Sequence, residues 1–201
     1  RIKNCYLRVE KGEVVIRCSP LFSQSEIEKL IRNHQEEILE QIKGYVPKYN
    51  YQEDGYVYLF NQKYQIVLKD MNIKKCAIHD RQIYVYSKNI QATIEMFLKQ
   101  ELMNYLKERI DFYLSTSFHH VFPEIQIKKM KRRWGACFYQ KNRVCFNLVL
   151  AHIDYALIDY VIVHELCHFL EANHSKAFYH EIEKRMPDYK ERERLLKDVG
   201  I

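Results

Sequence analysis

An apolar segment that ends in three polar side chains constrains the fold more than any other feature of the chain. Residues 156–163 are mainly aliphatic, and an H-E-x-x-H sequence formed by His164, Glu165 and His168 follows them. Residues i and i+4 lie about 40° apart on a helix, so the two imidazoles point the same way and can hold one metal ion. Glu165 lies on the adjacent flank, where it can act as a general base towards water without being a ligand. Burial of these groups on an apolar helix requires polar partners, and a metal ion supplies them.

A third metal ligand is needed, because a catalytic zinc ion usually takes three protein ligands. His174 is the best placed, ten residues after His164. On a straight helix that offset turns His174 roughly 80° away from His164. We therefore expect the helix to end or bend between residues 169 and 173, where Asn173 tolerates a left-handed conformation. Three other side chains remain alternative third ligands: Glu171, Glu181 and, as the weakest, His180.

Hydrophobic periodicity divides the rest of the chain into strand-like and helix-like segments. Strand-like runs occur at 6–9, 14–17, 56–60, 64–68, 76–78, 82–86, 125–127, 134–138 and 143–147, and the first two form a hairpin. Helical spacing occurs at about 25–43, 90–116 and 154–172, the last with Asp154 as its N-cap, and two more helices over 175–198 are broken at Pro187. We predict an α+β fold: a β-rich N-terminal region, residues 1–88, precedes an α+β region, residues 89–201, with a small antiparallel sheet.

Composition limits the class of protein. Hydrophobic residues make up 47% of the 201 residues and charged residues 29%, which is ordinary for a globular chain and excludes extensive disorder. No apolar run is long enough for a transmembrane helix and no signal-peptide core is visible, so we expect a cytoplasmic protein with no membrane contact. The net charge of +6 favours acidic partners but does not by itself indicate nucleic acid, which we do not expect as a main partner.

The six cysteines are scattered along the chain, and no C-x-x-C pair occurs. We therefore predict reduced thiols, typical of the cytosol, and no zinc cluster built from cysteines. Cys137 and Cys145 are the one pair that a hairpin would bring face to face.

A basic run, residues 128–133, precedes the only tryptophan of the chain, Trp134. One interpretation is a solvated strand edge with Trp134 packed in the core. The other is a cationic rim that holds an anionic group of a substrate, beside an edge strand that pairs with an extended peptide. On this second interpretation the residues that contact substrate are Arg132, Arg133, Trp134 and Tyr179. The donors available to stabilise an oxyanion are Tyr179, His180 and Arg133.

Five stretches of the sequence form a recognisable combination of motifs: Arg132–Cys137, Arg143–Leu148, Ile158–His168, Asn173–Phe178 and Met186–Lys190. Together they resemble the YgjP-like metallopeptidase-domain family. The resemblance covers about residues 120–198 closely, and the N-terminal half only through its order of hairpin, helix and strands.

What this resemblance implies is specific. It implies a compact zincin-like core, in which a short sheet packs on an active-site helix and a backing helix. It also implies one zinc ion (Zn2+) held by His164, His168 and His174, with Glu165 as the catalytic base. Two departures from the family pattern, Ala136 in place of Ser and His152 in place of Pro, lie outside this set.

Three functions are compatible with these observations. The favoured hypothesis is zinc-dependent hydrolysis of a peptide or protein, with Glu165 moving the proton. The alternative is metal-dependent hydrolysis of an anionic small molecule such as a nucleoside triphosphate, which the basic run favours and the absence of a P-loop disfavours. The third is a non-enzymatic, zinc-stabilised binding module, which requires a closed site with four ligands.

Overall fold

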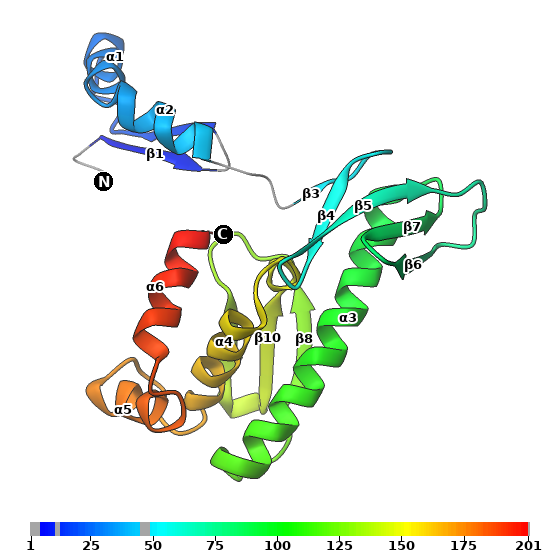
Figure 1. The fold of residues 1–201 in the computed structure, drawn as a ribbon. Helices are drawn as coiled ribbons and strands as arrows, with labels where there is room; N and C mark the ends of the chain where they lie inside the picture. The colour runs from blue at the N-terminus through cyan, green and yellow to red at the C-terminus, as the bar shows by residue number, and fades with distance from the viewer. Residues whose placement is uncertain (1–4, 11–12, 45–48, 201) are drawn as a thin grey trace. The chain divides into compact units, whose positions relative to one another are not determined.

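The computed structural model describes residues 5–10, 13–44 and 49–200 (Figure 1). It divides into two compact units, residues 1–48 and residues 49–201. The boundary that the sequence analysis placed after residue 88 falls inside the second unit. The reason is that the strands over residues 49–86 share one hydrophobic core with the long helix that follows, through contacts of residues such as Ile66 and Leu98.

The first unit is a hairpin followed by two helices. Strands β1 (Tyr6–Glu10) and β2 (Glu13–Arg17) pair antiparallel, as the sequence predicts. The single helix predicted over 25–43 is in fact two helices, α1 (Gln24–Asn33) and α2 (Gln35–Gly44). The break falls at His34, whose Nδ1 lies 3.0 Å from the carbonyl oxygen of Leu30. No Gly or Pro marks this position, so periodicity alone does not reveal the break.

The second unit begins with a five-stranded sheet. Its strands are β3 (Tyr49–Asn50), β4 (Tyr56–Leu59), β5 (Gln62–Leu68), β6 (Lys75–His79) and β7 (Gln82–Tyr86), in the order β3-β4-β5-β7-β6. Only β5 and β7 pair in parallel. Alternate side chains turn inward and are buried, including Val57, Ile66 and Val85.

The inner face of this sheet packs with α3 (Ile90–Tyr113) in one core. Five aliphatic side chains at helical spacing along α3 are fully buried: Ile94, Leu98, Leu102, Leu106 and Ile110. The helix continues into a π-helical turn, η1 (Leu114–Phe118), so its regular part ends earlier than predicted. His119 follows in the left-handed conformation and closes the segment.

A second, three-stranded sheet has the order β8-β10-β9. Its strands are β8 (Glu124–Lys128), β9 (Gly135–Phe138) and β10 (Arg143–Asn147). The prediction of an antiparallel sheet is wrong for one pair, because β8 and β10 are parallel while β9 and β10 are antiparallel. Residues 129–134 carry the chain across to the far edge of β10, and the Asn147 side chain holds them by donating to the carbonyls of Met130 (2.7 Å) and Arg133 (2.8 Å).

The two cysteines of this sheet do not bridge. Cys137 lies opposite Val144, and Cys145 lies opposite Ala136, so the two side chains point to different faces. Both thiols are free. The predicted hairpin is therefore present, but its register is one residue away from the one that a disulfide needs.

The remaining chain is helical. A short η2 (Tyr139–Lys141) joins β9 to β10, and η3 (Leu148–His152) leads into α4 (Tyr155–Cys167). Helices α5 (Lys176–Arg185) and α6 (Tyr189–Val199) follow, separated at Pro187 as predicted. Figure 1 shows α4 between α6 and α3, and α4 contacts both of these helices. Among the described helices, none has the length and apolar character needed to cross a membrane.

Candidate metal centre

Helix α4 is buried along most of its length, which places its polar side chains in a protected environment. Asp154 caps it as predicted, since its Oδ1 accepts a hydrogen bond from the backbone N–H of Ala156 (2.8 Å). The helix ends at Cys167, earlier than the expected 169–173. A turn follows, in which the N–H of Glu171 donates to the carbonyl of Cys167 (2.9 Å). Asn173 does not adopt the left-handed conformation predicted for it.

This early turn brings three histidines together. The candidate ligand atoms of His164, His168 and His174 all lie within 4.8 Å of one another. The Nε2 atoms of His164 and His174 are 3.0 Å apart. Two nitrogens bound to one tetrahedral zinc ion lie about 3.4 Å apart, given bonds of about 2.1 Å. Three imidazoles at this spacing fit a single metal ion.

The alternative third ligands lie elsewhere. Within the described residues, the group of His, Cys, Asp or Glu side chains that can share one ion comprises only the three histidines. The carboxylate of Glu181 instead accepts hydrogen bonds from Lys184 (2.8 Å) and Arg185 (2.6 Å). Glu171 contributes its backbone carbonyl, which lies 3.2 Å from Nδ1 of His168. That contact leaves Nε2 of His168 free for an ion, as is usual for metal-binding histidines.

The environment favours the neutral form of the His164 and His168 imidazoles, which is the form that binds a metal. Burial, together with the charges of His168 and His174, lowers the pKa of His164 to about 3. Burial also lowers the pKa of His168. All three rings contact the ring of Phe178 on α5, with centroid distances of 5.0 Å, 4.6 Å and 4.8 Å. Phe178 is fully buried and fixes the ring positions, a role that its sequence position alone does not reveal.

Glu165 lies beside the histidines and is only 5% exposed. Its burial raises the pKa of its carboxyl group to about 8, while the backbone N–H of Cys137 and the charge of Arg133 act in the opposite direction. The side chain lies directly against Gly135, where a Cβ atom would come within 2.5 Å of Glu165 Oε1. Only glycine at this position of β9 leaves room for the carboxylate.

Glu165 and the histidines line one cavity of about 610 Å³. Of the residues predicted to contact substrate, Arg133 and Trp134 line this cavity, whereas Arg132 and Tyr179 do not. Tyr179 lies behind His174, with a centroid distance of 6.4 Å. A further wall of the cavity, which the sequence did not predict, is formed by residues of α4 and α6: Tyr160, Val161, Glu193, Leu196 and Lys197. The packing of α4 on α6 creates this wall, and no local pattern encodes it.

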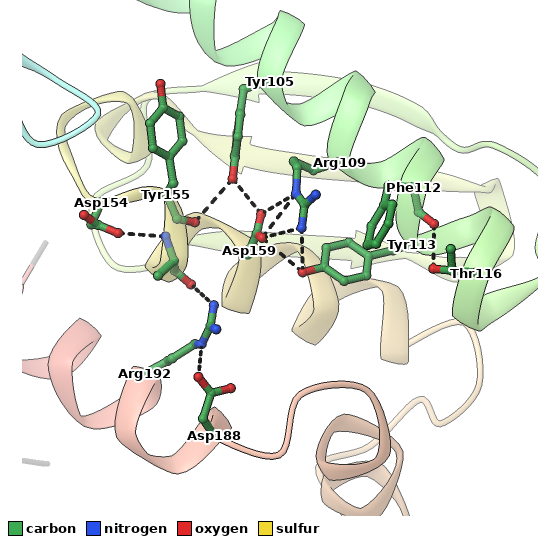
Figure 2. A network of polar contacts seen from close by, with 11 residues as sticks. Tyr105, Arg109, Phe112, Tyr113, Thr116, Asp154, Tyr155, Asp159, Asp188 and Arg192 are labelled. Atoms are coloured by element: carbon green, nitrogen blue, oxygen red, sulfur yellow. Dashed lines mark hydrogen bonds and ion pairs between the residues drawn. The ribbon is translucent and has the colours of Figure 1, made fainter.

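A buried polar network fixes α4 to α3 on the side away from the cavity. Figure 2 shows three side chains of α3 converging on Asp159. Tyr105 donates to its Oδ1 (2.8 Å), Arg109 donates to its Oδ2 (2.7 Å) and Tyr113 donates to the same oxygen (3.1 Å). On the α6 side, Arg192 donates to the carbonyl of Ala156 (2.8 Å). These bonds hold the helix that carries two of the histidines and Glu165.

Comparison with known protein families agrees with this geometry. The family model described as "YgjP-like, metallopeptidase domain" matches residues 3–199. The chain belongs to this family. Membership in the YgjP-like family implies a metal-dependent peptidase acting on a peptide or protein, and the resemblance inferred from the sequence is confirmed.

Two solved structures are similar to this YgjP-like chain over about half its length. One is the metallopeptidase zymogen abylysin of Pyrococcus abyssi, at 17% identity and a TM-score of 0.43, covering 47% of this chain and 94% of that one. The other is the metallopeptidase zymogen jannalysin of Methanocaldococcus jannaschii, at 24% identity and a TM-score of 0.42, covering 47% of this chain and 96% of that one. No curated protein sequence matches the chain significantly.

Proposed function

We propose that this chain is a zinc-dependent metallopeptidase in which His164, His168 and His174 hold one zinc ion and Glu165 is the general base. The observation that carries this proposal is the buried Glu165 carboxylate, which lies beside a three-histidine cluster in one cavity. Three histidine ligands leave one position of a tetrahedral ion open, as catalytic zinc sites do. When bound, zinc supplies a Lewis acid that polarises a carbonyl and acidifies water.

Glu165 performs the proton transfers in this proposal. Its carboxylate takes a proton from the attacking water and then delivers that proton to the leaving amine. Burial makes this carboxylate a stronger base than an exposed glutamate. The N–H of Cys137 and the packing against Gly135 fix its orientation, so the proton acceptor stays at one place in the cavity.

Strand β9 supplies a binding edge for an extended peptide. It lies at the edge of its sheet. The N–H of Asn147 donates to the carbonyl of Trp134 (2.8 Å), so in an antiparallel pair Gly135 and Cys137 turn their backbone groups away from β10. The bond from Cys137 to Glu165 agrees with this orientation. The outward groups of Gly135 and the carbonyl of Cys137 are then available to pair with substrate backbone.

Within the basic run, only Arg133 lines the cavity. Lys129 instead pairs with Glu95 (2.6 Å), and Arg132 is exposed outside the cavity. A nucleotide phosphohydrolase would need several cations around its phosphates. The cavity is lined by two cations, Arg133 and Lys197, together with the carboxylate of Glu193, and this small number of cations supports a peptide substrate over a nucleoside triphosphate.

The proposal is tested by assaying the zinc-loaded full chain on a peptide library and on a panel of nucleoside triphosphates. We expect peptide cleavage that Glu165→Gln abolishes while one zinc per chain is retained. His174→Ala should lose the zinc, and His180→Ala, which changes a histidine outside the three-histidine cluster, should keep it. Triphosphate cleavage without peptide cleavage would overturn the peptidase assignment, and zinc retention by His174→Ala would overturn the ligand set.

A further inference from the structure

The outer face of the five-stranded sheet carries an unusual set of side chains. The inner face buries Val57, Ile66 and Ile83, so the alternate residues of the same strands point outward. We call these outward residues the aromatic face. Its strand residues are Asn50, Tyr56, Tyr58, Lys63, Gln65, Val67, Lys75, Ala77, His79, Gln82, Tyr84 and Tyr86, and Lys69 continues it directly after β5.

This face combines aromatic rings with positive charge. Four of its members are tyrosines, each of them partly exposed, and Lys63, Lys69 and Lys75 are exposed. No Asp or Glu stands at any outward strand position. The carboxylates of this region lie in the turns between strands, at Glu53, Asp54, Asp70 and Asp80.

The strand register places rings and amines side by side. Tyr58 lies opposite Lys63, and Tyr84 lies opposite Val67. The Nζ atom of Lys63 is 4.2 Å from the ring centroid of Tyr56, and that of Lys69 is 5.0 Å from the ring centroid of Tyr84. One strand separates the tyrosine pair of β4 from the pair of β7, which sets the pairs about 10 Å apart. Lys63 and Lys69 stand between the two tyrosine pairs, on β5 and directly after it, and Lys75 of β6 lies opposite Tyr86.

The core does not account for these rings. Tyr64 and Leu68 of β5 point inward and pack against the hydrophobic core, whereas the four outward tyrosines do not belong to it. The preference of tyrosine for strands explains why such residues are tolerated here. It does not explain the exclusion of carboxylates from a face with three lysines.

We propose that the aromatic face binds single-stranded nucleic acid. Bases stack on tyrosine rings regardless of sequence, and lysine amines neutralise the phosphates between them. A duplex hides its base faces and therefore cannot use the rings. Other polyanions can pair with the lysine amines without stacking on the tyrosine rings. Loss of binding when the tyrosine rings are removed therefore distinguishes a nucleic acid from an acidic protein. The overall charge of +6 does not indicate this function, because it does not report how charges are divided among faces.

The test is a titration of the full chain against fluorescein-labelled dT12 and U12, followed by anisotropy at 50–200 mM salt. We expect the single strands to bind about tenfold more tightly than a duplex of the same length, because each stacked base contributes about 1–3 kcal/mol. Tyr58→Thr with Tyr84→Thr should weaken binding by about tenfold or more, because each stacked base contributes about 1–3 kcal/mol. Tyr58→Phe with Tyr84→Phe should bind within about twofold of the original chain, since the ring faces remain.

The lysines provide an independent readout. Changing Lys63, Lys69 and Lys75 to Gln should reduce the magnitude of the slope of log K against log salt by about 2, given about 0.7 per phosphate contact on single strands. Lys99→Gln with Lys107→Gln, on the exposed surface of α3, serves as the matched control and should change little. Photo-crosslinking of a bromouridine oligomer should label peptides that contain residues 56–69 or 82–86.

Several outcomes would overturn the proposal. One is the absence of binding at 100 μM protein, a concentration on the order of the weakest non-specific affinities. Another is equal affinity for single strand and duplex. A third is binding that the lysine variant weakens but the threonine variant does not, which would identify a general polyanion surface. Crosslinks confined to residues 128–134 would place the nucleic acid at the basic run instead.

Discussion

Helix α4 carries two buried carboxylates that differ in their hydrogen-bond partners. Asp159 faces α3 and accepts hydrogen bonds from Tyr105, Arg109 and Tyr113. Glu165, less than two turns further along the chain, faces the cavity and has the N–H of Cys137 as its hydrogen-bond donor. Asp159 thus has three hydrogen-bond donors, whereas Glu165 has a raised pKa and lines the cavity. The same helix therefore contains a carboxylate that stabilises the fold and a carboxylate that we propose as the general base.

The largest expected effect comes from Glu165→Gln. We expect kcat on a cleavable peptide to fall by about 10²–10⁴-fold, because a general base is lost while the shape of the side chain is kept. The free energy of unfolding should stay the same or rise, since the native residue is a buried and poorly satisfied carboxylate. Steady-state kinetics and urea unfolding of the same preparation check both parts. A large loss of stability would show that the Glu165 carboxylate, like that of Asp159, stabilises the fold.

At Asp159 we expect a substitution to reduce stability, in contrast to Glu165→Gln. Asp159→Ala leaves Arg109 partly buried without its carboxylate, and we expect the free energy of unfolding to fall by about 3–5 kcal/mol. Asp188→Ala is the matched control, because it removes the exposed partner of Arg192 and should cost about 0–1 kcal/mol. Urea unfolding measures both variants. Equal losses for the two variants would contradict the structural role of the network in Figure 2.

Gly135→Ala sharpens the account of how Glu165 is oriented. The added methyl group would lie 2.5 Å from Glu165 Oε1, so the carboxylate must move. We expect kcat to fall by about 10²-fold, as for a misplaced reacting group. Overpacking should cost about 1–3 kcal/mol of stability. The zinc content should stay at one per chain, measured by elemental analysis.

The control for Gly135→Ala cannot be Gly55→Ala, because the backbone carbonyl of Asn50 leaves no room for a Cβ atom at Gly55. Ala136→Ser, at the neighbouring position of β9, is used instead and should leave kcat within about twofold.

The smallest effect concerns a third carboxylate, Glu181 on α5. Hydrogen bonds and charges from Lys184 and Arg185 lower the pKa of Glu181 to about 2. Because the folded pKa lies below the unfolded one, the stabilisation is present above about pH 4.5 and is lost as the pH falls towards 2. The pairs are partly exposed, so we expect about 1 kcal/mol at neutral pH. Thermal unfolding of Glu181→Gln and the original chain should differ at pH 7 and converge near pH 2, and a constant difference would contradict this assignment.

Sequence patterns predict the parts of this site that lie within one helix. The spacing of His164 and His168 and the apolar residues before them define α4 without reference to any other segment. Other parts depend on contacts between distant segments. The helix ends at Cys167, although no Gly or Pro lies there, and His174 reaches the other histidines through the turn that follows. The parallel pairing of β8 with β10 and the position of Leu196 in the cavity wall also arise from tertiary packing.

The predicted boundary after residue 88 also shows that contacts between distant segments are not read from local sequence patterns. The texture of residues 56–86 is strand-like up to the start of α3, which favours a boundary near residue 88. The structure joins this sheet to α3 because Val57 and Ile83 belong to the same hydrophobic core as Leu98 of that helix. Hydrophobic periodicity identifies the buried face of each element, but it does not say which other element covers that face.

The most direct test of the central claim is the metal coordination of the zinc-loaded chain, measured by anomalous diffraction at the zinc edge. We expect one zinc ion with Nε2 atoms of His164, His168 and His174 at about 2.0–2.1 Å and one position open towards Glu165. A fourth protein ligand, or an ion bound away from these histidines, would contradict it.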